Sequence, residues 1–442
     1  MRATSLSGSL SRRRPAVAAA MLTVLYGALA LLPDKAQAAE ARPEDLDRPR
    51  QSLAKWIETE RAQSGVPGLS IAVIKEFRIK WAAGFGLADL ERGTPVTTDT
   101  LFQAASVSKP ATAVAVLIAL NRRGLNIDDD ARDILKRFRP TSAENWHLAD
   151  PYPTKLTIRM LLSHTGGTNA FHYSGYRYAY GAKQPHPIDT LPSLADELLG
   201  RAPANTPAIA VEREPGDTWV YSPAGYTILQ AILEGLEGKP FASAMDELLL
   251  KQISSSAGTF EQPAPPSISA RIATPYVDRN TPLNDGPRVF VAAASGGWTT
   301  TPTGVANLLI AIQKSLAGTS KNIITQDIAR AATTRQLGHT PAGKCFPTAN
   351  AREEAYNNSW GLGFDVNLNK SFEHEADDRP SGAWFGHSGF NSGYLTLAVA
   401  SKTGGKGVVI MMNLAPENMS GDVPIWSFMR RIEQRIAEEE GR

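Results

Sequence analysis

Ser106 and Lys109 are spaced so that one side chain could activate the other. Residues three apart on a helix share a face, so the lysine amine can reach the serine hydroxyl. A serine is a weak nucleophile without an adjacent base, and a lysine can be that base where burial disfavours its charged form. The first turn of a helix also adds positive potential where an oxyanion would form. The pair predicts acyl transfer through an ester on Ser106.

The same S-x-x-K pattern occurs at Ser52-Leu53-Ala54-Lys55, and the surroundings separate the two copies. Ser52 lies in an amphipathic stretch whose polar face we expect to be solvated. Ser106 instead follows Phe102-Gln103-Ala104-Ala105 and begins a nearly all-apolar stretch, so Lys109 is expected where solvent is scarce. A charged residue in such a place indicates a functional role. Ser106, and not Ser52, is therefore the predicted nucleophile.

Hydrophobic patterning predicts the elements that position this pair. A strand hairpin is expected over 68–74 and 77–86, and a buried helix over 107–123 that Gly124 ends. Other helices are expected over 157–166, 222–238 and 423–439 and after Thr301-Pro302, and other strands over 360–366, 383–389, 394–401 and 407–413. This order predicts an α/β (α+β) fold: an antiparallel sheet built from N- and C-terminal segments and flanked by helices, with an inserted, mainly helical region at about 130–290.

The first 38 residues are expected to be a signal peptide. Arg12-Arg13-Arg14 precedes an apolar run over 16–32, and Ala36-Gln37-Ala38 offers the small residues that a signal peptidase needs. The alternative is an N-terminal membrane anchor, but about 17 apolar residues interrupted by Gly27 are at the short limit for a spanning helix. We therefore expect a periplasmic or secreted domain over 39–442, exported by the Sec or the twin-arginine route, with no stable membrane span after signal removal.

Composition argues against several function classes. The 442 residues are 42% hydrophobic with a formal net charge of +2 and no basic block, so nucleic acid is not expected as a partner. Cys345 is the only cysteine, so no intrachain disulfide can form, and nothing near it in the sequence would activate its thiol. The histidines lack the close spacing of metal-ligand pairs, and Glu373-His374-Glu375 fits a solvated loop. No glycine segment has P-loop context, so no nucleotide, metal or other cofactor is expected.

Five stretches of the sequence resemble the serine β-lactamase and penicillin-binding-protein superfamily, in its class C-like branch of esterases and D-amino-acid peptidases. They are LFQAASVSK at 101–109, LLSHTGG at 161–167, EPGDTWVYSPAGYTILQ at 214–230, ASGGWTTTP at 294–302 and FGHSGFNSGY at 385–394. Their order and spread cover nearly all of the chain after the signal peptide, and together they are highly specific. The resemblance implies the β-lactamase/transpeptidase-like form of the predicted fold.

The resemblance also implies a role for each site residue. Ser106 is the acylated nucleophile, Lys109 its proton partner, and Tyr221 a second base at the first position of a Y-x-N motif. A tyrosine titrates near pH 10, so that role requires a nearby cation such as Lys109. His387-Ser388-Gly389 takes the place of the K-T-G or H-x-G segment on a strand that lines the substrate site. The backbone N–H groups of Ser106 and Phe390 would form the oxyanion hole.

Three other matches to these motifs are rejected by their positions. Lys402-Thr403-Gly404 is followed at once by Gly405 and fits a hairpin turn between the last two strands. His164-Thr165-Gly166 closes a helix, where a histidine is expected to cap carbonyl groups. Tyr356-Asn357-Asn358 leads into a strand and follows the Ser295-Gly296-Gly297 segment, which is out of order.

Two departures from the family pattern bear on the substrate. Pro223 occupies the Asn position of Y-x-N and offers neither a side-chain amide nor a backbone N–H, although Ser222-Pro223 is a favourable helix start. His387 stands where β-lactamases place a lysine that attracts the substrate carboxylate, and a histidine is mostly neutral at pH 7. Esters, amides or D-amino-acid peptides are therefore expected as substrates ahead of penicillins.

The inserted region contains a cluster of aromatic residues, for which two interpretations stay open. The cluster comprises His172, Tyr173, Tyr176, Tyr178 and Tyr180. These rings could line a substrate pocket, or they could form a surface loop packed on itself.

Together these features predict a serine hydrolase that forms an acyl-enzyme with an ester, an amide or a D-amino-acid peptide. The partner would be a small-molecule or peptide substrate. An alternative within the same chemistry is a β-lactamase or a D,D-carboxypeptidase. An alternative of another class is a catalytically weak protein that binds or senses cell-wall fragments, which the missing polar contact at Pro223 keeps open.

The choice between the two S-x-x-K copies gives a direct prediction. Ser106→Ala is expected to abolish the cleavage of p-nitrophenyl esters, because the nucleophile is lost, whereas Ser52→Ala leaves the rate unchanged. Initial rates of nitrophenolate release check both variants. An equal loss in both would mean that the wrong copy was chosen.

Overall fold

A computed structural model describes residues 46–178, 189–255, 257–320, 322–336, 360–366, 383–417 and 424–440. Its centre is a six-stranded antiparallel sheet. In spatial order the strands are β3 (Thr94–Pro95), β2 (Arg78–Asp89), β1 (Gly68–Lys75), β8 (Gly407–Met412), β7 (Tyr394–Ser401) and β6 (Trp384–Asn391). Ile71 of β1 lies opposite Ile410 of β8, so both ends of the chain share one sheet. The predicted fold class is confirmed.

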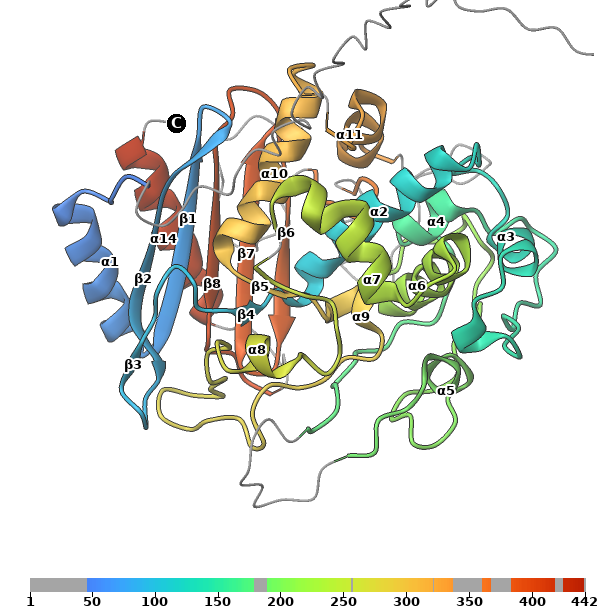
Figure 1. Cartoon of the computed structure of the whole chain (residues 1–442), viewed down its shortest axis with the longest axis horizontal. Helices are drawn as coiled ribbons and strands as arrows, with labels where there is room; N and C mark the ends of the chain where they lie inside the picture. The colour runs from blue at the N-terminus through green and yellow to red at the C-terminus, as the bar shows by residue number, and fades with distance from the viewer. Residues whose placement is uncertain are drawn as a thin grey trace, which may run out of the picture. The chain divides into compact units, whose positions relative to one another are not determined.

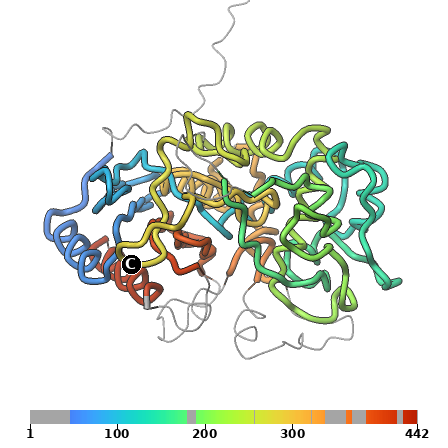
Figure 2. Tube along the Cα trace, turned by 90° about the horizontal axis from the view of Figure 1, so that it is seen from below, coloured from blue at the N-terminus to red at the C-terminus, as the bar shows by residue number. Residues whose placement is uncertain are grey.

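The sheet is covered on both faces, which explains why its central strands are apolar at nearly every position. Alternate residues of a strand point to opposite faces. Ile71 and Val73 belong to the core beneath α1 (Gln51–Gln63) and α14 (Pro424–Glu440), which lie side by side (Figures 1 and 2). Ala72 and Ile74 face the other core, which includes α10 (Pro302–Leu316) and the helical region.

Two hairpins of the sheet form as predicted. β1 and β2 are joined through Glu76 and Phe77, whose φ angles of 54° and 60° suit a two-residue turn between twisted strands. β7 and β8 are joined by a turn that contains Lys402-Thr403-Gly404, with Gly404 at φ 76°. This K-T-G match therefore lies in a turn and not on a strand.

The strand predicted over 360–366 is wrong. This segment is a tight loop in which Trp360 bridges to Asp365. Gly363 turns the loop with φ 81°, and a Cβ on it would lie only 2.6 Å from the Cβ of Ala113. The apolar residues of the segment are thus buried in a turn that glycine permits. An apolar pattern alone does not distinguish such a turn from a buried strand.

The site is held by two buried helices, α2 (Ser108–Arg122) and α6 (Pro223–Glu237), which pack against each other. The other helices are α3 (Ala131–Arg137), α4 (Ile158–Leu162), α5 (Leu194–Leu199), α7 (Phe241–Met245), α8 (Pro266–Ser269), α9 (Ala293–Gly296) and α11 (Gln326–Thr333). Single turns occur at η2 (Ala105–Val107), η3 (Thr141–Ala143), η4 (Asp246–Leu250) and η5 (Lys251–Ile253). The helix predicted over 157–166 is shorter, because α4 ends at Leu162 and His164 has a φ of 62°.

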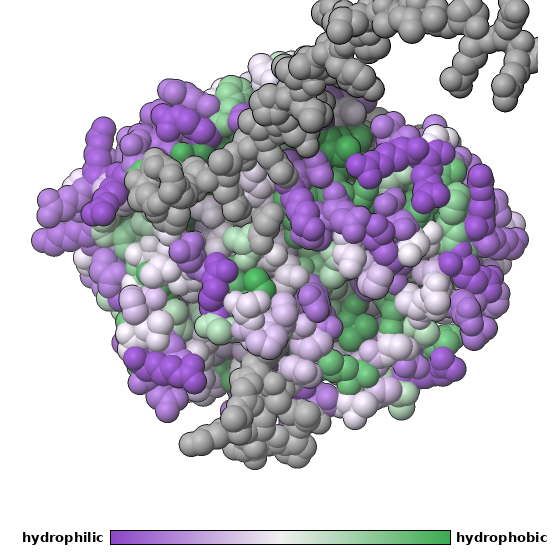
Figure 3. All heavy atoms as spheres, viewed as in Figure 1, coloured by the Kyte–Doolittle hydropathy of each residue, from purple (hydrophilic) through white to green (hydrophobic). Residues whose placement is uncertain are grey.

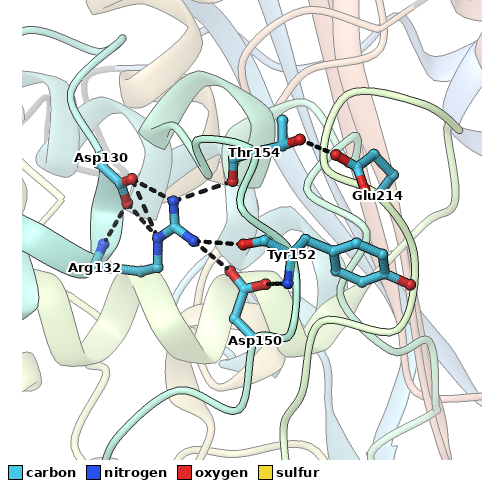
Figure 4. A network of polar contacts seen from close by, with 6 residues as sticks. All are labelled: Asp130, Arg132, Asp150, Tyr152, Thr154 and Glu214. Atoms are coloured by element: carbon cyan, nitrogen blue, oxygen red, sulfur yellow. Dashed lines mark hydrogen bonds and ion pairs between the residues drawn. The ribbon is translucent and has the colours of Figure 1, made fainter.

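A polar network fastens two segments that lead into the site (Figure 4). It comprises Asp130, Arg132, Asp150, Tyr152, Thr154 and Glu214. The Arg132 guanidinium donates to both aspartates and to two carbonyl oxygens of the set. The Thr154 hydroxyl donates to Glu214. Thr154 lies shortly before α4, and Glu214 lies shortly before Tyr221. The network therefore joins the segment that leads into α4 to the segment that leads to Tyr221.

The described helices and the face drawn in Figure 3 show how apolar and polar residues are distributed in the described part of the chain. None of the described helices is long and apolar enough to cross a membrane. On the face drawn in Figure 3, hydrophilic residues are distributed around the rim and are not gathered in one place. The predicted signal peptide lies outside the described residues.

Candidate active site

Ser106 lies in a sharp turn between a short strand and α2. The strand β4 (Phe102–Gln103) pairs with β5 (Thr299–Thr300), and the N–H of Ala104 donates to the Trp298 carbonyl at 2.8 Å. Ala105 then adopts a left-handed backbone with φ 50°, although it is buried and is not a glycine. Such a conformation persists only where the surroundings enforce it. Ser106, the next residue, is half-buried.

Lys109 reaches Ser106 from one helical turn further on. Its Nζ lies 3.1 Å from Ser106 Oγ and 2.8 Å from the carbonyl oxygen of Ser295. The lysine is 1% exposed, and burial lowers its pKa from 10.5 to about 7. The amine is therefore partly neutral near pH 7, when its lone pair can accept the Ser106 proton while one N–H donates to Ser295.

Ala294, the residue before the carbonyl group that binds Lys109, is held by the two site helices. The N–H of Ala294 donates to Gln230 Oε1 at 3.0 Å, and the carbonyl oxygen of Ala294 accepts from Thr112 Oγ1 at 3.0 Å. Gln230 lies on α6 and Thr112 on α2. The helices that present the nucleophile and Tyr221 thus also fix the acceptor next to the amine.

Tyr221 precedes α6 and lies with its ring near the lysine amine. Lys109 Nζ is 4.9 Å from the centre of the Tyr221 ring. The ring also lies edge to face with Trp360, with centroids 5.8 Å apart. Ser222 caps α6 with its side chain and Pro223 is the first residue of the helix, so the predicted helix start is confirmed.

Strand β6, at the edge of the sheet, brings His387 and Gly389 to the Ser106 turn. A Cβ on Gly389 would lie 2.3 Å from the carbonyl oxygen of Ala104 and 3.2 Å from the backbone nitrogen of Ser106. Only glycine permits this approach. The His387 ring centroid is 6.3 Å from that of Tyr221, so the strand and the residue before α6 line one site.

The backbone of β6 can offer N–H groups to this site, because no described strand pairs with its outer edge. Gly386 exchanges both of its backbone hydrogen bonds with Asp365 at that edge. Alternation along a strand turns the N–H groups of Ser388 and Phe390 the same way. The Phe390 side chain belongs to the core on the α14 side. Phe390 would therefore contribute through its backbone, as the predicted oxyanion hole requires.

His387 is neutral in this setting. Burial, followed by the charge of Lys109, lowers its pKa to about 3. Its Nδ1 contacts the carbonyl oxygen of Ser388, and its Nε2 has no hydrogen-bond partner among the described residues. The position therefore supplies no positive charge for a substrate carboxylate at neutral pH.

The expectation that His164 caps helix carbonyl groups is wrong. Its ring is buried, with its centroid 4.4 Å from that of Tyr221 and 5.4 Å from that of Tyr226. The left-handed turn after α4 carries the ring toward Tyr221 instead of the helix end. Its Nδ1 accepts from the N–H of Ser222, which is 58 residues away in the chain. The only sequence signal for this contact was its place in the LLSHTGG stretch.

The aromatic cluster of the inserted region divides between the two interpretations. The hydroxyl groups of Tyr173 and Tyr176 are bound inside the protein, at 2.7 Å from Thr227 Oγ1 and 2.6 Å from Glu197 Oε1. His172 is exposed, and its ring centroid is 6.1 Å from that of Phe390, so it lies beside β6, the strand that carries His387. Tyr178 is half-buried, and Tyr180 lies outside the described residues.

Metal-binding groups are scattered in the described ranges. No three His, Cys, Asp or Glu side chains there gather so as to hold a metal ion. Cys345, Glu373-His374-Glu375 and Tyr356-Asn357-Asn358 lie outside those ranges.

Comparison with known proteins identifies relatives of this chain and of its fold. A family model described as β-lactamase matches residues 53–426. Esterase EstB of Burkholderia gladioli is 34% identical over 212 residues, which are 48% of this chain and 50% of that protein. Penicillin-binding protein 4 of Amycolatopsis lactamdurans is 28% identical over 189 residues, 43% of each chain. The chain thus spans half or less of the length of these relatives.

Solved structures show the same fold at low sequence identity. The D-amino acid amidase from Ochrobactrum anthropi, complexed with L-phenylalanine amide, matches with a TM-score of 0.62 and 17% identity over 88% of this chain and 99% of that chain. EstCE1, a hydrolase with promiscuous acyltransferase activity, matches with a TM-score of 0.60 and 19% identity over 86% and 97%.

The contact between Gly389 and the Ser106 turn gives a testable prediction. Gly389→Ala places a Cβ against the Ala104 carbonyl group and forces β6 away from the turn. We expect p-nitrophenyl ester cleavage to fall by about 100-fold, because the oxyanion hole is lost, with a melting temperature a few degrees lower. Gly404→Ala is the control: it strains a turn of the same sheet but meets no atom within 4 Å, and it should keep the full rate. Full activity of the Gly389 variant would contradict the proposed hole.

Proposed function

The chain belongs to the β-lactamase family, and on that premise we propose that it is a serine hydrolase that works through an acyl-enzyme on Ser106. The observation that carries the proposal is the Lys109 amine, which is buried 3.1 Å from the Ser106 hydroxyl. A lysine with a pKa of about 7 is a competent base at neutral pH. A lysine that served only the fold would gain nothing from being buried beside a hydroxyl group.

The proposed reaction uses groups of this chain alone. Ser106 Oγ attacks the substrate carbonyl carbon and its proton passes to Lys109 Nζ. The carbonyl oxygen becomes an oxyanion between the N–H groups of Ser106 and Phe390. The C–O or C–N bond to the leaving group breaks as that group takes a proton, with Tyr221 as the shuttle. Water then attacks the ester on Ser106, gives its proton back through the same groups, and releases the acid.

The proposed substrates are small esters, amides or D-amino-acid peptides. Two features support an uncharged reacting end: the neutral His387 and the absence of a side-chain amide at Pro223. The matched relatives and structures include a protein named as an esterase and one named as a D-amino acid amidase. We further propose that the chain is exported after removal of residues 1–38 and acts in the periplasm or outside the cell.

Two active-site probes test this function. The protein without residues 1–38 is incubated with a fluorescent fluorophosphonate and, separately, with a labelled penicillin, and adducts are mapped by mass spectrometry. We expect a stable phosphonate adduct on Ser106 and none in the Ser106→Ala variant. A penicillin adduct that hydrolyses quickly would favour a β-lactamase instead. No adduct with either probe would leave a binding or sensor role and would overturn the enzyme proposal.

The pKa of Lys109 predicts the pH dependence of the reaction. Since only the neutral amine can accept a proton, kcat/KM for p-nitrophenyl acetate should rise about tenfold per pH unit below pH 7 and level off above it. Burial lowers the pKa of His387 to about 3, well below pH 7, and it also lowers the pKa of His172 from that of an ordinary histidine. Lys109→Arg should be inactive at every pH, because a guanidinium stays charged. A profile that stays flat through pH 7 would rule out Lys109 as the base.

A further inference from the structure

His164 has an unusual backbone for a residue in the core. It is 3% exposed and has a φ of 62°, in the left-handed region that non-glycine residues rarely occupy. Holding a residue in that region costs free energy. The contacts made by this residue must offset that cost.

Three contacts of His164 involve Tyr221 or its two chain neighbours. The carbonyl oxygen of His164 accepts from the N–H of Val220 at 3.0 Å. Its Nδ1 accepts from the N–H of Ser222 at 3.1 Å. Its ring lies against the ring of Tyr221, with centroids 4.4 Å apart. One residue thus binds the backbone on both sides of Tyr221 and also packs on its side chain.

The hydrogen bond to Ser222 fixes the protonation state of His164. An Nδ1 that accepts a hydrogen bond cannot carry a proton, so the ring is neutral with its proton on Nε2. Burial and the neighbouring Lys109 and His387 lower the pKa of His164, which agrees with the neutral form. Tyr221 and Tyr226, the other titratable groups against the ring, carry no positive charge. Protonation would break the bond to Ser222 and put a second cation near Lys109.

The segment that carries His164 is attached to the fold by other bonds. Leu162, two residues earlier, accepts from the Tyr226 hydroxyl at 3.0 Å and from the N–H of Gly363 at 3.1 Å. Thr165, the next residue, donates to Met160 and accepts from Gly216. The ring of His164 is therefore not required to hold the segment that carries it. The one hydrogen bond of the ring is made with Ser222, the residue after Tyr221.

We propose that His164 is a positioning residue that holds Tyr221 against Lys109. It acts through the backbone N–H of Ser222 and through contact with the Tyr221 ring, and it does not touch the substrate. This role rests on the proposed serine hydrolase, in which Tyr221 carries the proton to the leaving group.

Two substitutions separate the contacts of the ring. His164→Gly removes the ring and tolerates the positive φ, whereas His164→Asn also tolerates that φ and keeps an acceptor, because its Oδ1 lies near the place of Nδ1. A misplacement of about 1 Å costs about 100-fold in rate. We therefore expect His164→Gly to lower kcat for an alkyl ester such as ethyl butyrate, whose leaving group must take a proton, by about 10- to 100-fold with KM changed less than about threefold, and His164→Asn to lose less than about fivefold.

A double-mutant cycle distinguishes positioning from a general loss of structure. If His164 acts through Tyr221, His164→Gly should cost nothing further in a Tyr221→Phe background. An equal loss in both backgrounds would overturn the proposal. If the His164→Gly variant fails to fold, the test rests on His164→Asn alone. A loss of kcat of more than about 30-fold in a variant with a normal melting curve would show that the hydrogen bond to Ser222 does not position Tyr221, and it would overturn the proposal.

Amide hydrogen exchange tests the same contact without any substrate. In His164→Gly the Ser222 N–H loses its acceptor and should exchange at least about tenfold faster, while the Val220 N–H keeps its bond to the backbone carbonyl of residue 164 and serves as the internal control. Unchanged exchange at Ser222 would overturn the proposal. Faster exchange in a protein whose Ser106 reacts with no phosphonate would support the contact and reject the proposed hydrolase, so the two failures are distinguishable.

Discussion

The structure depends on one unfavourable interaction, the burial of the Lys109 amine, which forms no ion pair with an acid among the residues that the structure describes. A pKa lowered from 10.5 to about 7 means that the charged amine is disfavoured in the folded protein by roughly 5 kcal/mol. That cost is complete below pH 7, where the amine is protonated in both folded and unfolded chains, and it fades as the pH rises toward 10.5. The site is built around holding this amine beside a single hydroxyl group, and the same burial that destabilises the fold makes the amine a base.

The rest of the fold supplies rigid partners for that amine from distant parts of the chain. Ser106 lies in η2 directly before α2, and Lys109 lies in the first turn of α2. Ala294, the residue before the Ser295 carbonyl group, is held by α2 and α6. β6 lies so close to the Ser106 turn that Gly389 has no room for a side chain. Since β6 is joined through β7 and β8 to β1, the two ends of the chain must both be in place before the site exists. The inserted helices then contribute Tyr221 from the other side.

The sequence was sufficient wherever chemistry and structure are local. The S-x-x-K spacing, the β1–β2 hairpin and the Ser222-Pro223 helix start each follow from residues a few positions apart. The errors arose where long-range packing decides. The segment 360–366 is apolar enough for a strand but folds back at Gly363, and the role of His164 depends on a hydrogen bond to a residue 58 positions later. No periodicity within a single segment contains that information.

The departures at 223 and 387 are connected through the pKa of the same lysine. An anionic substrate bound near Lys109 would favour the charged amine and raise its pKa, which removes the base at neutral pH. A lysine at position 387 would counter this effect, because a second positive charge lowers the pKa of Lys109 while it binds the anion. His387 is neutral and cannot do so. We therefore expect a site with a histidine there to retain its base for substrates that bring no negative charge close to Ser106. Such substrates also have less polarity to match, which fits the lack of a side-chain amide at Pro223.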